Sequence, residues 1–223
     1  MSRGELIVGT SADYPPFENF SWPYTGEIIG FDVDVSQLIA DELGVTLTMT
    51  HIDFTQLIAT CKAGTVDMIA AAMTYTPERA ESLAPSITYI TVSQVVMVKD
   101  ASPLTTITNL TDLIGHTIGC QSGTVMQDEL EAIAGISVVA YPSAIVLMTN
   151  LLADNVEAAY VDEPIFNYYN RTEDLRIIYS TGSEPLALWT RHGEPELLYV
   201  MNEVIFEAYL DGTMYDLIDT WFG

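Results

Sequence analysis

The chain is poor in positively charged residues. Only seven of its 223 residues are Lys or Arg, against 31 Asp and Glu, so its formal net charge at pH 7 is −24. Proteins that bind nucleic acid contact phosphates through clustered Lys and Arg. The composition therefore argues strongly against nucleic acid as a partner, and it predicts an acidic surface that extends over the whole chain.

Cysteine is scarce too, since the sequence contains only two, Cys61 and Cys120. Two cysteines cannot form a disulfide framework, and neither lies at a metal-ligand spacing. Both fall in apolar stretches, which favours two buried free thiols over a bridge. We expect neither a metal site nor a cofactor.

Long apolar runs are missing as well. None reaches the roughly 18 residues of a membrane-spanning helix. No signal peptide precedes the first predicted strand, so we expect a chain that is either cytosolic or given without its export or anchor segment. Apolar residues nevertheless make up 49% of the sequence and aromatic residues 10%, which is enough to build one or two globular domains.

Short apolar runs alternate with helical patterns along most of the chain. The predicted strands are Glu5–Thr10, Val45–Ile52, Val66–Ala72, Gln94–Val98, His116–Gln121, Ser137–Ala140 and Ala158–Val161. The predicted helices are Asp32–Leu43, Thr55–Lys62, Thr124–Ile133, Ala144–Leu152, Glu196–Leu210 and Met214–Trp221. The alternation predicts an α/β fold of two lobes, each with a mostly parallel sheet. Ligands of such folds bind at the carboxyl ends of strands.

The segment after Val66–Ala72 carries a conspicuous arginine. Thr76 and Pro77 predict a helix start, which places Arg79 in the first turn. A cation there opposes the helix dipole, so in a cation-poor chain we interpret Arg79 as the partner of an anion. A guanidinium can bind a carboxylate through two parallel hydrogen bonds. The alternative is a surface arginine paired with a nearby glutamate.

Two further strand ends carry residues suited to charged groups. Gly123 and Thr124 open a helix, where free backbone N–H groups attract anions, although this is also an ordinary cap sequence. Asp162 follows Ala158–Val161 and either caps the next helix or pairs with a bound cation. Arg79 and Thr124 together suit an anion and Asp162 suits a cation, which describes the two ends of an α-amino acid.

Six short motifs occur in one order along the chain. They are Tyr14-Pro15-Pro16-Phe17-Glu18, Gly30-Phe31-Asp32-Val33-Asp34-Val35, Met73-Thr74-Tyr75-Thr76-Pro77-Glu78-Arg79, Gln121-Ser122-Gly123-Thr124, Val161-Asp162, and Asp211-Gly212-Thr213 with Trp221-Phe222-Gly223. From Leu6 to Gly223 the sequence resembles the type II periplasmic binding proteins for polar amino acids, the extracytoplasmic receptors of ABC importers.

The resemblance implies a role for each matching residue. Arg79 would bind the ligand α-carboxylate together with Thr74 and the backbone N–H of Thr124. Asp162 would hold the α-ammonium with the carbonyl of Ala72. Tyr14 and Phe54 would flank the ligand side chain.

The resemblance also implies an architecture, a location and partners. Lobe 1 would be discontinuous, formed by residues 1–90 and 183–223, and lobe 2 would be 91–182, with hinge crossings near 89–93 and 182–185. Ligand would bind in the cleft between the lobes. A monomer would work in the periplasm or at the cell surface, with a free amino acid and a membrane-embedded permease as partners.

The sequence is compatible with two kinds of ligand. Ser11 occupies the position where relatives that bind basic ligands often have Asp. This difference argues against lysine or histidine as the ligand. Glu18 and Gln121 look like the residues of some arginine receptors, and two aromatic faces would sandwich a guanidinium. We expect arginine, or else glutamine or another polar amino acid.

Two other functions use the same scaffold. An enzyme resembling the cyclohexadienyl dehydratases would need a general acid, for which Glu18 or Glu163 would serve, but neither has a visible partner to tune its pKa. A sensory domain of a membrane receptor would look identical once excised. We therefore expect a binding protein and no catalytic residues.

Overall fold

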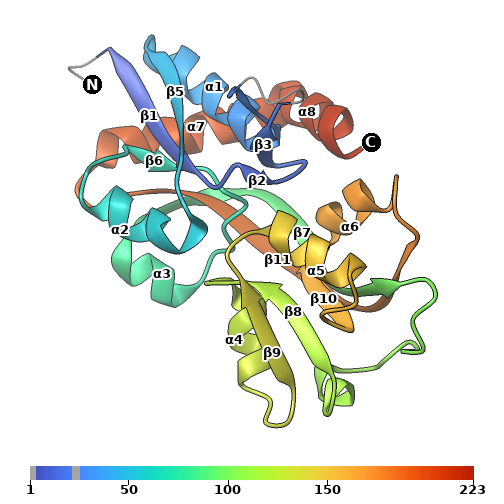
Figure 1. The fold of residues 1–223 in the computed structure, drawn as a ribbon. Helices are drawn as coiled ribbons and strands as arrows, with labels where there is room; N and C mark the ends of the chain where they lie inside the picture. Colours follow the sequence, from blue (N-terminus) through green and yellow to red (C-terminus); the bar gives the residue numbers. More distant parts are fainter. Residues whose placement is uncertain (1–3, 22–25) are drawn as a thin grey trace. The chain divides into compact units, whose positions relative to one another are not determined.

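The chain is described by a computed structural model that covers residues 4–21 and 26–223. Its backbone divides into two units: unit 1 is Met1–Thr91 with Pro185–Gly223, and unit 2 is Val92–Glu184. Each unit is an α/β structure, as the alternation of strands and helices predicted. Figure 1 shows the elements of both, coloured along the chain.

The main sheet of unit 1 is built on parallel strands. β1 (Glu5–Thr10) pairs in parallel with β5 (Thr46–His51) and with β6 (Met68–Ile69). The end of β11 (Leu175–Thr190) then pairs antiparallel with β6. Alternate residues of β1 point to opposite faces, and Leu6 and Val8 on one face are fully buried.

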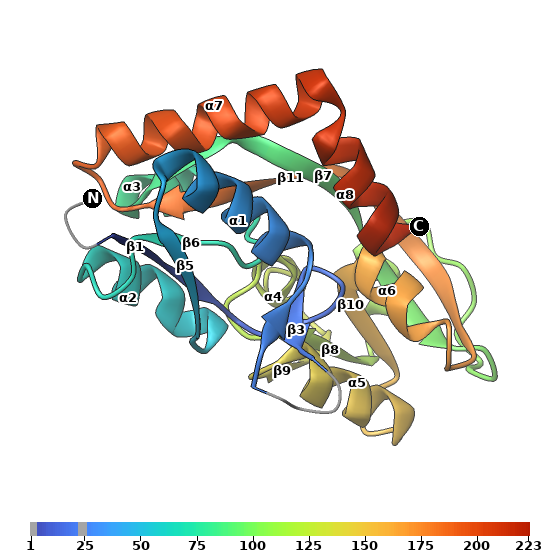
Figure 2. The same cartoon turned by 90° about the horizontal axis from the view of Figure 1, so that it is seen from above.

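Helices cover both faces of this sheet. Figure 2 shows α1 (Phe31–Leu43) and α7 (Pro195–Asp211) on one side of β1, β5 and β6, and α2 (Leu57–Lys62) on the other. The remaining elements of unit 1 are the 3₁₀ turn η1 (Phe54–Gln56), α3 (Pro77–Ser82), α8 (Thr213–Phe222), and a small antiparallel sheet of β2 (Asp13–Tyr14), β3 (Glu18–Phe20) and β4 (Ile28–Ile29).

Glycine sets both ends of α1. Gly44 ends the helix in the left-handed conformation, with φ 65°, which is the usual role of glycine after the last helical turn. Gly30 precedes it with φ 144°, and a Cβ at this position would lie 2.0 Å from the carbonyl oxygen of Phe17. Only glycine lets the chain of β3 approach the start of α1 this closely.

Unit 2 repeats the α/β pattern. In its sheet β8 (Thr117–Gln121) lies between β9 (Ser137–Tyr141) and β10 (Ala158–Asp162), parallel to both. β10 also pairs antiparallel with β7 (Ala84–Lys99). α4 (Val125–Glu131) and α5 (Ala144–Leu152) flank β8, and α6 (Glu163–Tyr169) follows β10. A 3₁₀ turn, η2 (Leu110–Leu113), precedes β8.

Two strands differ most from the sequence prediction. β7 (Ala84–Lys99) and β11 (Leu175–Thr190) have 16 residues each and run through both units. The local pattern placed only Gln94–Val98 in a strand here and none at β11, because Pro85, Gly182 and Pro185 interrupt the apolar pattern. The family resemblance alone implied crossings near 89–93 and 182–185. The predicted strand Val66–Ala72 shortens to β6, since the chain turns at Ala72, whose φ is 45°.

Each unit has its own apolar core, and each core contains one cysteine. Cys61 packs with Leu57 and Trp189 in unit 1, and Cys120 packs with Ile118 and Leu130 in unit 2. Both are buried free thiols. Across the described residues, every helix is too short or too polar to cross a bilayer.

Candidate functional site

Arg79 is held by its own helix start. The Thr76 hydroxyl accepts the backbone N–H of Arg79 at 3.1 Å and Pro77 opens α3, which confirms the predicted cap. The guanidinium Nη1 donates to the carbonyl oxygen of Thr74 at 2.7 Å. These contacts fix the guanidinium in the connection between β6 and α3.

An aromatic ring supports the same guanidinium. Arg79 Cζ lies 5.7 Å from the ring centroid of Phe54 on η1, within the range of a cation–π interaction. Phe54 and Thr74 are buried, at 8% and 6% exposed. The structure therefore brings together three residues that the sequence assigned to a ligand, all within unit 1.

The β2–β3 ribbon carries two more predicted site residues. Tyr14 on β2 stands directly opposite Glu18 on β3, so both side chains leave the same face of the ribbon. Tyr14 stacks on Phe17 at 6.1 Å between ring centroids, and Glu18 is fully buried. The ribbon thus presents an aromatic ring and a carboxyl group side by side.

Ser11 lies in the loop that follows β1 and is 2% exposed. The next residue donates its backbone N–H to Nδ1 of His51 at 3.0 Å. Sequence analysis gave His51 no role, because a contact between residues 39 positions apart leaves no trace in local spacing. The imidazole anchors the loop that carries Ser11.

Ala72 has a left-handed backbone conformation held by a buried carboxylate. Its φ is 45°, which is uncommon for a residue with a Cβ. Its N–H donates to Oδ2 of Asp32 at 2.8 Å, and the Tyr89 hydroxyl donates to Oδ1 of Asp32 at 2.7 Å.

Asp32 belongs to one of the six sequence motifs, but its local sequence does not indicate a role for it. Burial raises the pKa of Asp32 from 3.8 to about 6, although its hydrogen bonds act in the opposite direction. The signal that could have found it is helical spacing: Val35 and Ser36, three and four residues on, are also fully buried. A carboxylate on that face must enter the interior.

Unit 2 holds three of the predicted site residues. Gln121 ends β8, and its carbonyl accepts the Thr124 hydroxyl at 2.7 Å. Its Nε2 is buried and makes no hydrogen bond to any residue in 4–21 or 26–223. Gly123 between them has φ 78°, and its N–H donates to Oε1 of Gln127 at 2.8 Å. Thr124 then begins α4.

Asp162 is both the last residue of β10 and the residue before α6. It is 2% exposed, and its side chain makes no capping hydrogen bond to α6. The sequence left a helix cap and a cation partner as alternatives. Asp162 occupies the N-cap position of α6, and both alternatives remain predictions.

The ten predicted site residues divide unequally between the units. Ser11, Tyr14, Glu18, Phe54, Ala72, Thr74 and Arg79 belong to unit 1, and Gln121, Thr124 and Asp162 belong to unit 2. Unit 1 thus carries the arginine and the aromatic residues, while unit 2 carries the helix start and the aspartate.

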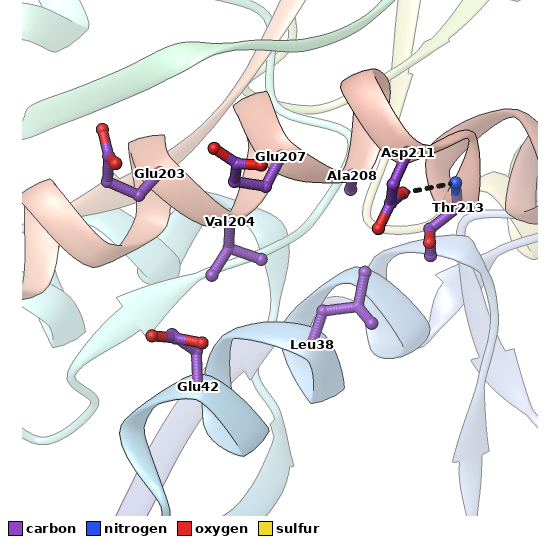
Figure 3. A pocket seen from close by; sticks show the side chains of 8 residues that line it. All are labelled: Leu38, Glu42, Glu203, Val204, Glu207, Ala208, Asp211 and Thr213. Carbon is purple, nitrogen blue, oxygen red and sulfur yellow. Dashed lines mark hydrogen bonds between the residues drawn. The ribbon is translucent and has the colours of Figure 1, made fainter.

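A separate pocket lies between α1 and α7 of unit 1 (Figure 3). Its rim carries the carboxylates of Glu42, Glu203, Glu207 and Asp211, and Asp211 accepts the backbone N–H of Thr213 at 2.8 Å. None of the ten predicted site residues lines this pocket.

Comparison with known proteins identifies a family. Residues 6–223 match the family described as bacterial extracellular solute-binding proteins, family 3. The arginine-binding extracellular protein ArtP of Bacillus subtilis (strain 168) is 29% identical, over 99% of this chain and 87% of its own length.

Solved structures agree with the sequence relatives. An ancestral arginine-binding protein bound to arginine has a TM-score of 0.93 and 30% identity, and the match covers 100% of both chains. A structure of an ancestral arginine-binding protein bound to glutamine has a TM-score of 0.92 and 30% identity over 99% of both chains.

Proposed function

This chain belongs to family 3 of the bacterial extracellular solute-binding proteins, and from that membership we propose that it captures a polar amino acid, arginine before glutamine, for delivery to an ABC transporter. The observation that carries the proposal is the placement of Arg79, held against Phe54 and the Thr74 carbonyl. Relatives named as arginine-binding proteins support it.

For the α-carboxylate we propose Arg79, Thr74 and Thr124. The guanidinium supplies two parallel N–H donors, which match a carboxylate better than a lysine would. Thr74 is buried next to it. The backbone N–H of Thr124 would add a donor at the start of α4.

For the α-ammonium we propose Asp162 and the carbonyl of Ala72. Asp162 is buried at the end of β10, where its carboxylate would pair with the ammonium. The left-handed turn at Ala72 redirects the backbone just after β6. Pairing both ligand charges is necessary because an unpaired buried ion costs several kcal/mol.

For the ligand side chain we propose Tyr14, Phe54, Glu18, Ser11 and Gln121. Two aromatic rings suit a planar guanidinium, and Glu18 would give it a countercharge. The buried Nε2 of Gln121 has no hydrogen-bond acceptor among the described residues, and it would donate to a ligand oxygen.

We further propose that units 1 and 2 are the two lobes, with hinges near 89–93 and 182–185 in β7 and β11. An amino acid held by residues of both units stabilises a closed state by its differential affinity for that state. The protein would act as a monomer outside the cytoplasm and would bind without turning over its ligand. Incubation with prephenate and arogenate should give no product.

The decisive experiment is calorimetric titration with the twenty common amino acids. The protein is first unfolded and refolded to remove any amino acid carried through purification. We expect tight binding of arginine, weaker binding of glutamine, and no response to acidic or aliphatic amino acids. Tight binding of an acidic or aliphatic amino acid, with none of arginine, would overturn the proposed ligand.

Two substitutions test the charge clamp. Arg79→Ala and Asp162→Ala should each weaken arginine binding at least about 100-fold, since each leaves one buried ligand charge unpaired, while the melting temperature changes little. The matched controls are Arg171→Ala and Asp128→Ala, at exposed positions of unit 2. Binding within threefold of the parent protein in either clamp variant would show the assignment to be wrong.

A further inference from the structure

The last turn of α8 packs against the loop that carries Tyr14. The ring centroid of Phe222 on α8 lies 5.0 Å from that of Phe17, and Phe17 stacks on Tyr14 at 6.1 Å. We propose that Phe222 is a positioning residue of the ligand site, which acts through Phe17 to set the orientation of the Tyr14 ring. This inference rests on the proposed function, in which Tyr14 flanks the ligand side chain, and it adds α8 to the elements that determine specificity.

Phe17, Phe31 and Phe222 form a cluster of three rings in which each ring contacts the other two. The centroids are 5.0 Å apart for Phe17 and Phe222, 5.1 Å for Phe31 and Phe222, and 6.3 Å for Phe17 and Phe31. The interplanar angles are 61°, 64° and 78° in the same order. Such edge-to-face pairs are favourable because the positive edge of one ring meets the negative face of the next. Each ring therefore limits the rotation of the other two.

Backbone hydrogen bonds hold the loop of Tyr14 without help from α8. The N–H of Phe17 donates to the carbonyl oxygen of Tyr14 at 3.0 Å, and the N–H of Asp32 donates to the carbonyl oxygen of Phe17 at 3.0 Å. A substitution at Phe222 leaves both bonds in place, so we expect the loop backbone to keep its path. The contribution of Phe222 is then the orientation of the side chains on that backbone.

Both ends of α8 are anchored within unit 1. Met214, at the start of the helix, is fully buried. At the other end, Trp221 donates its indole Nε1–H to Oδ2 of Asp34 at 2.7 Å. Asp34 belongs to the first turn of α1, and Figure 1 shows α8 beside this helix. The bond fixes the last turn of α8 against α1, and so it fixes where the ring of Phe222 enters the cluster.

Tyr14 takes its orientation from Phe17. The two rings are stacked with an interplanar angle of 27°, and Phe17 is fully buried. The Tyr14 ring cannot turn about its own axis without opening the stacked contact, so its plane follows that of Phe17. Because Phe17 in turn contacts Phe222, the plane of the ring assigned to the ligand depends on α8.

The orientation of Tyr14 matters most for a planar and charged side chain. A guanidinium gains from stacking and from cation–π attraction when the ring presents its face. The amide of glutamine is neutral and gains less from the same ring. Loss of the Phe222 ring should therefore weaken arginine binding more than glutamine binding. A general loosening of unit 1 would weaken the binding of both ligands alike.

The first test is calorimetric titration of Phe222→Leu with arginine and with glutamine. Leucine stays apolar but removes the ring. We expect the affinity for arginine to fall about three- to tenfold and that for glutamine less than about twofold, as the loss of an aromatic pair implies. Phe222→Tyr keeps the ring and should bind both ligands like the parent protein. The matched control is Phe206→Leu, at a 53% exposed position of α7, which should change neither affinity.

A double-mutant cycle separates positioning from a merely structural role. Tyr14→Leu removes the ring that Phe222 is proposed to orient. If Phe222 acts through that ring, the double variant Tyr14→Leu with Phe222→Leu should bind arginine within about twofold of Tyr14→Leu alone. A structural role would instead multiply the two losses of affinity.

Fluorine NMR provides a measurement that needs no ligand. When 3-fluorotyrosine replaces the 12 tyrosines, the signal of Tyr14 is the one that is missing from Tyr14→Phe. In the protein without ligand, this signal should shift in Phe222→Leu and keep its position in Phe206→Leu.

Each contrary result has a definite meaning. An unchanged Tyr14 signal, equal weakening of both ligands, or multiplied losses in the cycle overturns the inference while leaving the proposed function in place. Failure of the parent protein to bind either amino acid overturns both. Circular dichroism establishes that each variant is folded. If Phe222→Leu does not fold, Trp221→Phe provides the test: it removes the bond to Asp34, so the Tyr14 signal should shift, and an unchanged signal overturns the inference.

Discussion

Asp32 is an ionisable side chain whose complete burial makes the stability of the folded protein depend on pH. Its pKa in the folded protein is about 6, against 3.8 for the ordinary group, because it is fully buried. A raised acid pKa means that the folded state binds the proton more tightly than the unfolded state does. The stability that this group contributes is complete below pH 3.8 and is lost as the pH rises through 6.

Replacing Asp32 by Asn should remove this pH dependence. A shift from 3.8 to about 6 corresponds to roughly 3 kcal/mol between the two limits. Relative to the parent protein, Asp32→Asn should therefore be more stable at pH 8 than at pH 4, by up to that amount. Urea unfolding at both pH values measures the difference. Asp41→Asn serves as the control, and an identical difference for both variants would exclude Asp32 as the cause.

The reactivity of the two cysteines tests burial at single residues. Burial raises the pKa of Cys61 to about 11 and that of Cys120 to about 12. The thiolate is the reactive form, so neither thiol should react with a disulfide reagent such as DTNB at pH 8 in the native protein. Both should react within minutes in urea. A fast native reaction of one thiol would show that the core of its unit opens.

At the scale of elements, β8 and α5 are closely packed at Gly119. A Cβ at Gly119 would lie 2.5 Å from Cδ1 of Leu147 and 3.2 Å from Cγ2 of Val156. We expect Gly119→Ala to cost about 1–3 kcal/mol of stability through overpacking. Gly182→Ala in β11, which would meet nothing within 4 Å, should change it by less than about 0.5 kcal/mol.

The origin of that cost can be checked by shortening the neighbour. In Gly119→Ala with Leu147→Ala, the added methyl group occupies part of the space that the leucine leaves. The double variant should therefore be more stable than the sum of the two single effects predicts. Strict additivity in urea unfolding would attribute the cost to the backbone of β8 and not to contact with α5.

Local pattern predicted most elements of the fold. α5 was predicted at its observed bounds, Ala144–Leu152, and β1 and α1 within a residue of theirs. These segments have strong periodicity and clear end signals. β11 and the first half of β7 were missed because their pairing is decided by neighbours far along the chain, which override prolines and glycines in the local sequence.

For the site, the sequence indicated which residue types would bind a ligand, but it did not indicate which of them contact one another. Arg79 stood out because cations are rare, and its helix start is confirmed. The partners of Arg79 within unit 1, Phe54 and the Thr74 carbonyl, follow from the fold and not from spacing. Asp32 and His51 were missed for the same reason: each acts through a residue about 40 positions away.

At the scale of the whole molecule, the net charge of −24 acts on any charged ligand. Arginine carries a net positive charge and is attracted before contact, whereas glutamine is a neutral zwitterion. The association rate of arginine should fall as salt rises to about 0.5 M, where the screening length is only a few ångströms. Stopped-flow measurements should show little change for glutamine, and equal salt effects for both would rule out steering.

The discontinuity of unit 1 also has a consequence for synthesis on the ribosome. Unit 2 is one continuous stretch, Val92–Glu184, while unit 1 needs Pro185–Gly223 to complete it. Until those residues emerge, β6 lacks the strand that pairs with its second edge, and the face of α1 that packs on α7 has no cover. The nascent chain can therefore complete unit 2 before unit 1, because unit 1 is complete only once Pro185–Gly223 has emerged.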